Sequence, residues 1–287
     1  MPLLGSHMSI AGGYYKAVEA GKAVGCDCVQ LFTKNNNQWR AKPITQAEAD
    51  RFRGALVETG VSHPLSHSSY LINLAAPGEE LWAKSIEAMV VELQRAAQLG
   101  IPYVVLHPGS YTTSSEEEGL RRVAAALDVV HAKCGEVESR IALEGTAGQG
   151  SNLGYKFEHL AEIIALAREP DRLAVCLDTC HLFAAGYPLG TKEEFQATFA
   201  EFERIVGFER LVAFHLNDSV KGLGSRVDRH AHIGHGEMGL EPFRLLLGDK
   251  RFAAVPMYLE TAKGENEEGE DWDVVNLRTL RGLIGKP

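Results

Sequence analysis

The feature of this chain that most constrains its fold is a regular alternation of short apolar runs with amphipathic stretches. The apolar runs lie at residues 3–7, 28–32, 61–66, 103–107, 141–144, 173–178, 212–216 and 256–260. Stretches with helical periodicity lie at residues 46–59, 78–99, 116–133, 157–168, 192–206 and 271–284. This pattern predicts an α/β fold, a (β/α)8 barrel or TIM barrel, in which helices cover a parallel sheet. We expect one domain, residues 1–287, because no linker or low-complexity tract interrupts the pattern.

Composition argues against several classes of protein. The formal net charge of −9 argues against a surface that coats nucleic acid generally, although a local basic or metal-bearing groove is compatible with it. No apolar run approaches the ~20 residues that a membrane helix needs, and no signal peptide is evident. An odd, scattered set of cysteines favours small buried thiols in a reducing, cytoplasmic compartment over disulfides or a cysteine metal site. These cysteines are Cys26, Cys28, Cys134, Cys176 and Cys180.

Acidic and imidazole side chains stand where the predicted strands end. In "VCLDTCHLFAAGY" (175–187) an apolar run closes with Asp178, and His181 follows three residues later. The C-terminal ends of the strands of a TIM barrel meet on one face, where the active site is built. Potential metal ligands from successive strand–loop units should therefore share one cup. They are His67, His107, Glu144, Asp178, His181, His215, Asp228, His230 and Glu260.

This mixture of imidazoles and carboxylates predicts zinc, with manganese as an alternative at some positions. Carboxylates packed together without cations would repel one another and raise their pKa values, and metal ions remove that objection. Taken singly, each histidine fits a structural role better, and Glu144 or Glu260 alone could pair with a barrel Arg or Lys. The metal hypothesis rests on the recurrence at successive strand ends. Structural roles are expected for His63, His131, His159 and His235, packing or outer hydrogen bonds for His7, and contact with a metal ligand from outside for His232.

Several of these segments resemble the signatures of the endonuclease IV family of apurinic/apyrimidinic (AP) endonucleases, and the resemblance runs nearly end to end. The matching segments are "HSSYLINLA" (67–75), "GTAGQGSNLG" (145–154), "LDTCHLFAAGY" (177–187), "HLNDS" (215–219) and "SRVDRHAHIGHGEMG" (225–239). The resemblance implies a xylose isomerase-like TIM barrel that cleaves DNA on the 5′ side of an abasic site. The expected products carry a 3′-hydroxyl and a 5′-deoxyribose phosphate, and cleaning of 3′ ends is a family activity.

The resemblance also implies three zinc ions per chain. By this carry-over, one zinc takes His67 and His107 and shares Glu144, which becomes the bridging, catalytic ligand. A second takes Glu144 together with Asp178, His215 and Glu260. The third takes His181, Asp228 and His230. Asp178 and His181 would thus serve different metals, one from the strand and one from the loop.

Recognition of double-stranded DNA should come from loops around the cup. "FTKNNNQWRAK" (32–42) offers Lys34, Asn35, Asn37 and Trp39 for phosphate contacts and stacking, although a polar turn with one packed Trp explains this composition equally well. The resemblance implies that Tyr70 and Leu71 wedge into the base stack, where a missing base lowers the cost of unstacking. Family members often carry Arg where this chain has Asn37, which predicts a weaker contact there. Arg226 and Arg229 could hold phosphates or pair with acidic neighbours.

Two other functions fit parts of the pattern. A sugar isomerase or epimerase of the xylose isomerase-like type also places Glu, Asp and His at strand ends, but usually needs one or two metal ions in an oxygen-rich site. A non-catalytic DNA-damage binder should have lost ligands, and this chain retains the full set. We expect a nuclease that works in the cytoplasm on nucleoid DNA, with no membrane and no obligate protein partner.

Overall fold

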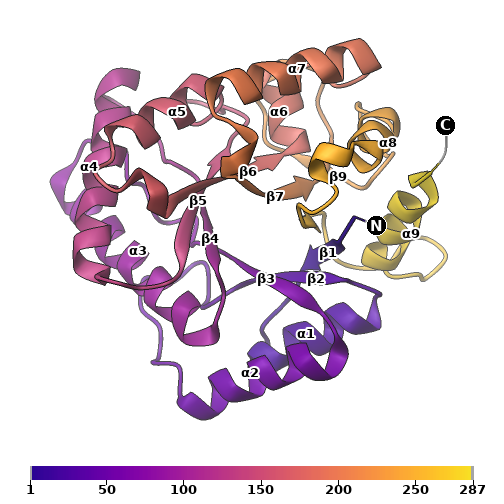
Figure 1. Cartoon of the computed structure of the whole chain (residues 1–287), viewed down its shortest axis with the longest axis horizontal. Helices are drawn as coiled ribbons and strands as arrows, with labels where there is room; N and C mark the ends of the chain where they lie inside the picture. The colour runs from indigo at the N-terminus through magenta and orange to yellow at the C-terminus, as the bar shows by residue number, and fades with distance from the viewer. Residues whose placement is uncertain (1, 286–287) are drawn as a thin grey trace.

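The computed structural model describes residues 2–285 and contains a closed parallel barrel (Figure 1). Around the barrel the strands follow the order β1-β10-β7-β6-β5-β4-β3-β2, and β2 pairs back onto β1. The barrel strands are β1 (Leu4–His7), β2 (Cys28–Phe32), β3 (Ser62–His67), β4 (Tyr103–Leu106), β5 (Arg140–Gly145), β6 (Leu173–Asp178), β7 (Leu211–Leu216) and β10 (Met257–Leu259). The predicted TIM barrel is therefore confirmed.

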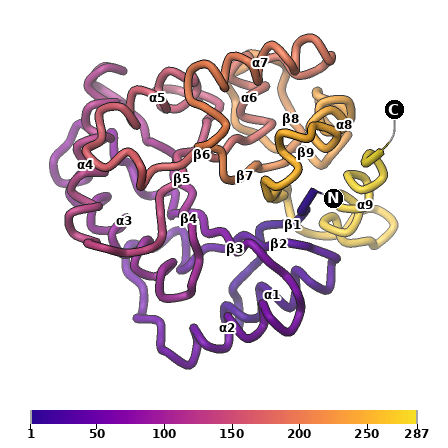
Figure 2. The backbone as a smooth tube through the Cα atoms, viewed as in Figure 1, coloured from indigo at the N-terminus to yellow at the C-terminus, as the bar shows by residue number. Residues whose placement is uncertain are grey.

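Helices connect the strands and form a ring outside them, as the tube in Figure 2 shows. They are α1 (Tyr14–Ala23), α2 (Gln46–Thr59), α3 (Glu79–Leu99), α4 (Glu116–Cys134), α5 (Phe157–Leu166), α6 (Thr179–Ala185), α7 (Lys192–Ile205), α8 (Glu241–Gly248) and α9 (Trp272–Leu283). Short 3-10 turns lie at Pro170–Arg172, Phe208–Arg210 and Lys250–Phe252. Local sequence sets several ends: Thr45 with Glu48 and Thr191 with Glu194 form capping boxes at the starts of α2 and α7.

The structure adds three helices, α1, α6 and α8, to those that the sequence indicated. α1 and α8 have ten and eight residues, so each offers few turns from which a helical period can be recognised, and α6 begins directly after β6 inside the segment 175–187. The other elements agree with the expected ranges to within a few residues. The domain expected over residues 1–287 includes residues 1, 286 and 287, which lie outside the described part of the chain. No helix within residues 2–285 is long and apolar enough to cross a membrane.

Two apolar layers hold the barrel together. Large side chains such as Phe52, Leu93 and Phe214 fill the main core. A second, smaller cluster includes Cys28, Ala142, Ala174 and Cys176, with Tyr258 as its one large member. Mostly small residues from strands β2 to β7 and β10 therefore gather in this second cluster, as expected for the interior of a barrel.

A small hairpin after β7 shapes the long loop at the mouth of the barrel. β8 (Asp218–Ser219) pairs antiparallel with β9 (His230–Ala231). The buried carboxylate of Asp218 accepts hydrogen bonds from the backbone N–H groups of Gly234, Gly236 and Met238 at 2.9–3.1 Å. One buried acid thus fixes the backbone on the far side of the hairpin, and with it the segment that carries Asp228 and His230.

Candidate metal centre

Six neighbouring barrel strands deliver donor side chains to one end of the barrel. His67 closes β3, Glu144 lies in β5, Asp178 closes β6 and His215 lies in β7. His107 and Glu260 stand one residue beyond β4 and β10. Because parallel strands end together at the same face, these side chains converge, and all except His107 and Glu260 are fully buried.

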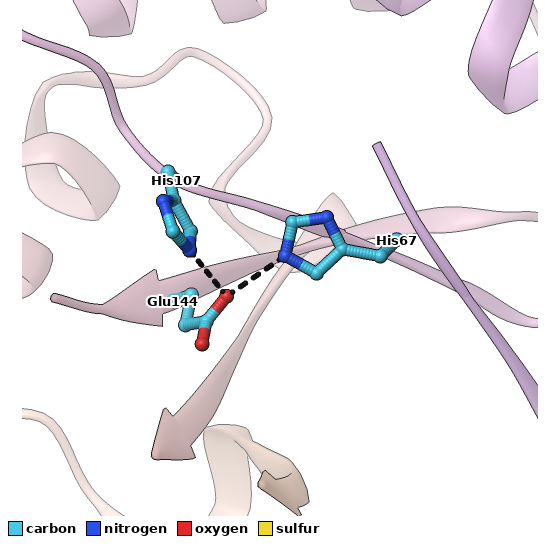
Figure 3. A group of neighbouring side chains, drawn as sticks. All are labelled: His67, His107 and Glu144. Carbon is cyan, nitrogen blue, oxygen red and sulfur yellow. Dashed lines mark hydrogen bonds and ion pairs between the residues drawn. The ribbon is translucent and has the colours of Figure 1, made fainter. Parts of the chain in front are cut away.

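Glu144 is the centre of this cluster. Its Oε2 lies 3.1 Å from His67 Nε2 and 2.9 Å from His107 Nε2. Figure 3 shows both imidazoles turned toward this oxygen, with the two contacts as dashed lines. Its Oε1 lies 2.9 Å from His215 Nδ1 and 3.3 Å from His181 Nδ1. The two carboxylate oxygens therefore face different groups of imidazoles, which is the arrangement that a bridging ligand requires.

The donor atoms form three groups, and within each group all atoms lie within 4.8 Å of one another. The first group is His67, His107 and Glu144. The second is Glu144, Asp178, His215 and Glu260. The third is Asp178, His181 and His230. Asp228 borders this third group, with its carboxylate oxygens 3.3 Å from His181 Nε2 and from His230 Nε2.

The offset between Asp178 and His181 has a local cause. Asp178 is both the last residue of β6 and the N-cap of α6, and its Oδ1 accepts a 3.0 Å hydrogen bond from the His181 backbone N–H. A cap residue and the third helical residue point in different directions from the same turn. Both side chains stay in the cup, but His181 reaches toward Asp228 and His230.

Backbone carbonyl groups orient three of the histidines. Nδ1 of His67 lies 2.7 Å from the Ser68 carbonyl oxygen, and Nδ1 of His181 lies 2.9 Å from that of Gly145. Nδ1 of His230 lies 3.3 Å from the Glu260 carbonyl oxygen. A carbonyl oxygen only accepts, so each contact favours a proton on Nδ1 and leaves the Nε2 lone pair directed at the donor group. These residues therefore fit a metal centre.

The charges of the cluster are strongly coupled. Burial opposes the charged form of Glu144, but nearby His215 and His107 and hydrogen bonds from His107 and His181 hold its pKa well below the ordinary value. Burial likewise opposes the anion of Asp228, yet His181 lowers its pKa to about 2. Burial disfavours a charged His181, but Asp178 and Asp228 raise its pKa well above the ordinary value. The neighbouring histidines thus favour the ionised forms of Glu144 and Asp228, and divalent cations would supply further positive charge beside them.

Two amides that the sequence interpretation missed support the donors. The Oδ1 of buried Asn217 accepts a 2.9 Å hydrogen bond from the Glu260 backbone N–H, and its Nδ2 donates to Asp178 Oδ2 at 2.6 Å. Gln30 Oε1 lies 2.8 Å from His215 Nε2, while its Nε2 donates to Glu260 Oε1. The signal in the sequence was a polar Gln inside the apolar strand "CVQLF" (28–32) and the Asn in "HLNDS" (215–219).

The cup opens into a cavity of about 480 Å³. Donors His67, His107, His181, Asp228, His230 and Glu260 line it, together with Tyr70, Asn73, Ser110 and Asn152. His7 lies beside the donors, as expected, with Nδ1 3.6 Å from Glu260 Oε1. His232 instead stacks on Trp272 at 3.8 Å between ring centroids and belongs to none of the donor groups.

Of the predicted DNA-contacting residues on the β2 and β3 loops, Tyr70 is the most prominent. Its side chain is 58% exposed, and its ring lies 5.6 Å from Phe32 and 5.1 Å from His67, centroid to centroid. Leu71 beside it is partly buried. Lys34 is different: its ammonium is buried, 3.0 Å from Glu92 Oε1, and does not face the surface as a phosphate contact would require.

The remaining predicted contacts lie at or near the surface. Asn35 and Asn37 are exposed, and Trp39 is half-buried with the Lys84 ammonium 4.3 Å from its ring centroid. Arg226 packs 4.0 Å over the Tyr155 ring and donates from Nε to the Gly148 carbonyl oxygen. Arg229 is exposed and donates to the Asp228 carbonyl oxygen.

Fold and site together define a xylose isomerase-like TIM barrel with a metal-type donor set in its mouth, and the model of that family matches residues 18–280. A probable endonuclease 4 from Citrifermentans bemidjiense is 51% identical over 284 residues, which cover 99% of each chain. The crystal structure of endonuclease IV from Thermus thermophilus has a TM-score of 0.86 at 39% identity, over 98% of each chain. The chain belongs to the endonuclease IV family of AP endonucleases and is an enzyme of that type.

A more distant likeness shows the fold alone. The crystal structure of a D-tagatose 3-epimerase-like protein has a TM-score of 0.71 at 18% identity, over 98% of this chain. The barrel architecture therefore does not distinguish a nuclease from a sugar epimerase. The family assignment rests on the full-length relatives, and it confirms the family that the sequence motifs indicated.

Proposed function

We propose that this enzyme is a DNA repair endonuclease that cleaves the phosphodiester bond 5′ to an abasic site, leaving a 3′-hydroxyl and a 5′-deoxyribose phosphate. The observation that carries the proposal is the convergence of three donor groups in one pocket, in a chain of the endonuclease IV family. Removal of blocking groups from 3′ ends is a further proposed activity of the same pocket. Residues 1–287 would act as one catalytic domain, in the cytoplasm on nucleoid DNA.

Three zinc ions are the proposed cofactors, with manganese as an alternative at some positions. His67, His107 and Glu144 would hold the first, and Glu144 with Asp178, His215 and Glu260 the second. His181, Asp228 and His230 would hold the third. Zinc with imidazole and carboxylate ligands supplies Lewis acidity toward phosphoryl oxygens and water.

The chain's own residues prepare the pocket for a phosphodiester. Gln30 and Asn217 hold the side chains of Asp178, His215 and Glu260 in place, so that little reorganisation is needed when substrate binds. A cysteine nucleophile does not fit. Burial raises the pKa of Cys176 to about 11 and that of Cys180 to about 12, so both thiols stay protonated at neutral pH.

The proposed DNA contacts surround the pocket. Tyr70 and Leu71 would enter the base stack beside the abasic nucleotide, a role that the exposure of Tyr70 next to His67 supports. Asn35, Asn37, Trp39, Arg226 and Arg229 would contact the DNA backbone or bases. Such contacts position the duplex without reading sequence, as a repair enzyme requires.

A duplex that carries a single abasic site tests the proposal. We expect the zinc-loaded enzyme to incise it on the 5′ side and leave a primer end that a polymerase extends, while an intact duplex of the same sequence stays uncut. Chelation should abolish incision and added zinc should restore it. Incision on the 3′ side, or none by the zinc-loaded enzyme, would refute this function, and sugar isomerisation in its place would favour the epimerase-like alternative.

A further inference from the structure

Two charged residues are buried one helical turn apart on α3, beneath the loops that follow β2 and β3. Glu92 is 1% exposed and Arg95 is 7% exposed. Burying an ionised side chain is costly unless partners satisfy it, so such a pair on the barrel-facing side of a helix calls for a specific reason. Neither residue belongs to the donor groups of the metal centre.

Glu92 joins the two loops. Its Oε1 accepts from Lys34 Nζ at 3.0 Å and from the Ser69 backbone N–H at 3.2 Å. Its Oε2 accepts from Thr33 Oγ1 at 2.8 Å. Thr33 and Lys34 begin the loop after β2, whereas Ser69 directly precedes Tyr70 in the loop after β3. One carboxylate therefore holds the starting points of both loops.

Lys34 extends this arrangement into its own loop. Its ammonium donates to the Gln38 carbonyl oxygen at 2.9 Å as well as pairing with Glu92. Arg95 donates to the Lys42 carbonyl oxygen at 2.7 Å and so fixes the far end of the same loop. A direct link closes the network, because Ser69 Oγ donates to the Asn36 carbonyl oxygen. The Lys34 ammonium therefore lies inside its loop, where groups of the protein itself pair with its charge.

We propose that the buried Glu92–Lys34 pair is a positioning element that sets the orientation of Tyr70 relative to the loop of residues 34–42. Lys34 serves as the internal strut of that loop and is not a phosphate contact. The inference rests on the proposed function insofar as the two loops grip damaged DNA. Its structural half, that Glu92 orders both loops, stands on the contacts alone.

Glu92→Gln, Lys34→Met and the double variant test the proposal in incision assays on the abasic duplex. We expect each single change to raise KM about tenfold with kcat within about twofold, because the metal ligands are untouched while a buried charge loses its partner. The double variant should be no worse than either single variant, since both remove one shared interaction. Glu87→Gln is the matched control: it lies on the same helix, in an exposed pair with Lys133, and should behave as wild type.

Salt dependence separates a strut from a phosphate contact. For a strut, the slope of log KM against log salt stays at the wild-type value in Lys34→Met. Loss of a phosphate contact would instead lower the slope by about one in Lys34→Met. That result, together with a wild-type KM in Glu92→Gln, would overturn the proposal. Should Glu92→Gln fail to fold, Ser69→Ala removes the link to Asn36 and is expected to raise KM in the same direction; a wild-type KM in that variant would count against the network.

Hydrogen exchange tests the positioning role of Glu92 independently of the proposed endonuclease function. In Glu92→Gln, without DNA, amides of residues 33–38 and 67–72 should exchange about tenfold faster than in wild type, because the carboxylate that fixed both loops is gone. Unchanged exchange would reject the positioning role whatever the enzyme cleaves. A wild-type enzyme that leaves abasic duplexes uncut would reject the proposed function and leave the exchange result standing.

Discussion

Glu144 has no exposed surface, yet four imidazoles lie within 3.3 Å of its carboxylate oxygens. No other side chain in the described cup belongs to both the first and the second donor group. A residue in that position couples the groups electrostatically, so its loss should disturb both. The neighbouring amides of Gln30 and Asn217 hold its partners and do not replace its charge.

Replacement of Glu144 by Gln should therefore lower turnover on the abasic duplex at least about a hundredfold, while the fold survives, because the amide keeps the shape and removes the negative charge. Initial rates, together with circular dichroism to verify folding, give the measurement. Glu58→Gln on the exposed face of α2 is the control and should leave the rate unchanged. Cleavage near the wild-type rate by the Glu144 variant would remove this residue from the proposed mechanism.

At the scale of elements, the loop after β7 depends on the Asp218 carboxylate and on a close approach at Gly236. A Cβ at Gly236 would lie 2.4 Å from the Ser219 carbonyl oxygen and 2.5 Å from Asp218 Oδ1. Such distances force the backbone apart. The hairpin of β8 and β9 would then shift, and His230 is part of β9.

Gly236→Ala should thus lower the number of metal ions bound per chain by about one, through loss of the group that contains His230, and reduce incision accordingly. Metal analysis after dialysis measures the change. Gly222→Ala in the same loop is the matched control, since no atom lies within 4 Å of its added Cβ. Full metal content and activity in Gly236→Ala would show that the loop tolerates the shift.

The same elements show what the sequence could predict. Strand ends such as "YVVLH" and "AVCLD" combine an apolar run with a potential ligand, so the barrel and the gathering of its donors followed from periodicity and parallel-strand geometry. The supporting roles of Gln30 and Asn217 could not be predicted in this way, because an amide is not itself a typical ligand for zinc. The burial of Lys34 could not be predicted because its partner, Glu92, lies far away in the sequence on a helix. Only the folded structure brings the two side chains together.

For the molecule as a whole, His131 near the end of α4 introduces a pH dependence of stability. The side chain is 1% exposed, and neither ring nitrogen has a hydrogen-bond partner among the described residues. Burial, reinforced by the positive charge of Arg172, lowers its pKa from 6.5 to about 4. Between about pH 6.5 and about pH 4, His131 is therefore protonated in the unfolded chain and neutral in the folded chain.

Above pH 6.5 His131 is neutral in both states, and the protein keeps its full free energy of unfolding. As the pH falls through this window, protonation of His131 in the unfolded chain lowers that free energy. At pH 5 the loss amounts to about 2 kcal/mol in the free energy of unfolding. His131→Leu should remove it, so that the variant gains about 2 kcal/mol relative to wild type between pH 8 and pH 5 in urea denaturation. If the free energy of unfolding falls equally with pH in the two proteins, His131 does not control the acid sensitivity of the fold.

At the same scale, the chain has a net charge of −9 whereas the proposed substrate is a polyanion, and divalent cations in the mouth of the barrel would supply the positive charge that binding needs. The most direct test of this central claim is the number of divalent metal ions bound per chain after zinc loading and dialysis, measured by mass spectrometry of the metal content. We predict three zinc ions per chain. One or two ions, or none, would contradict the account.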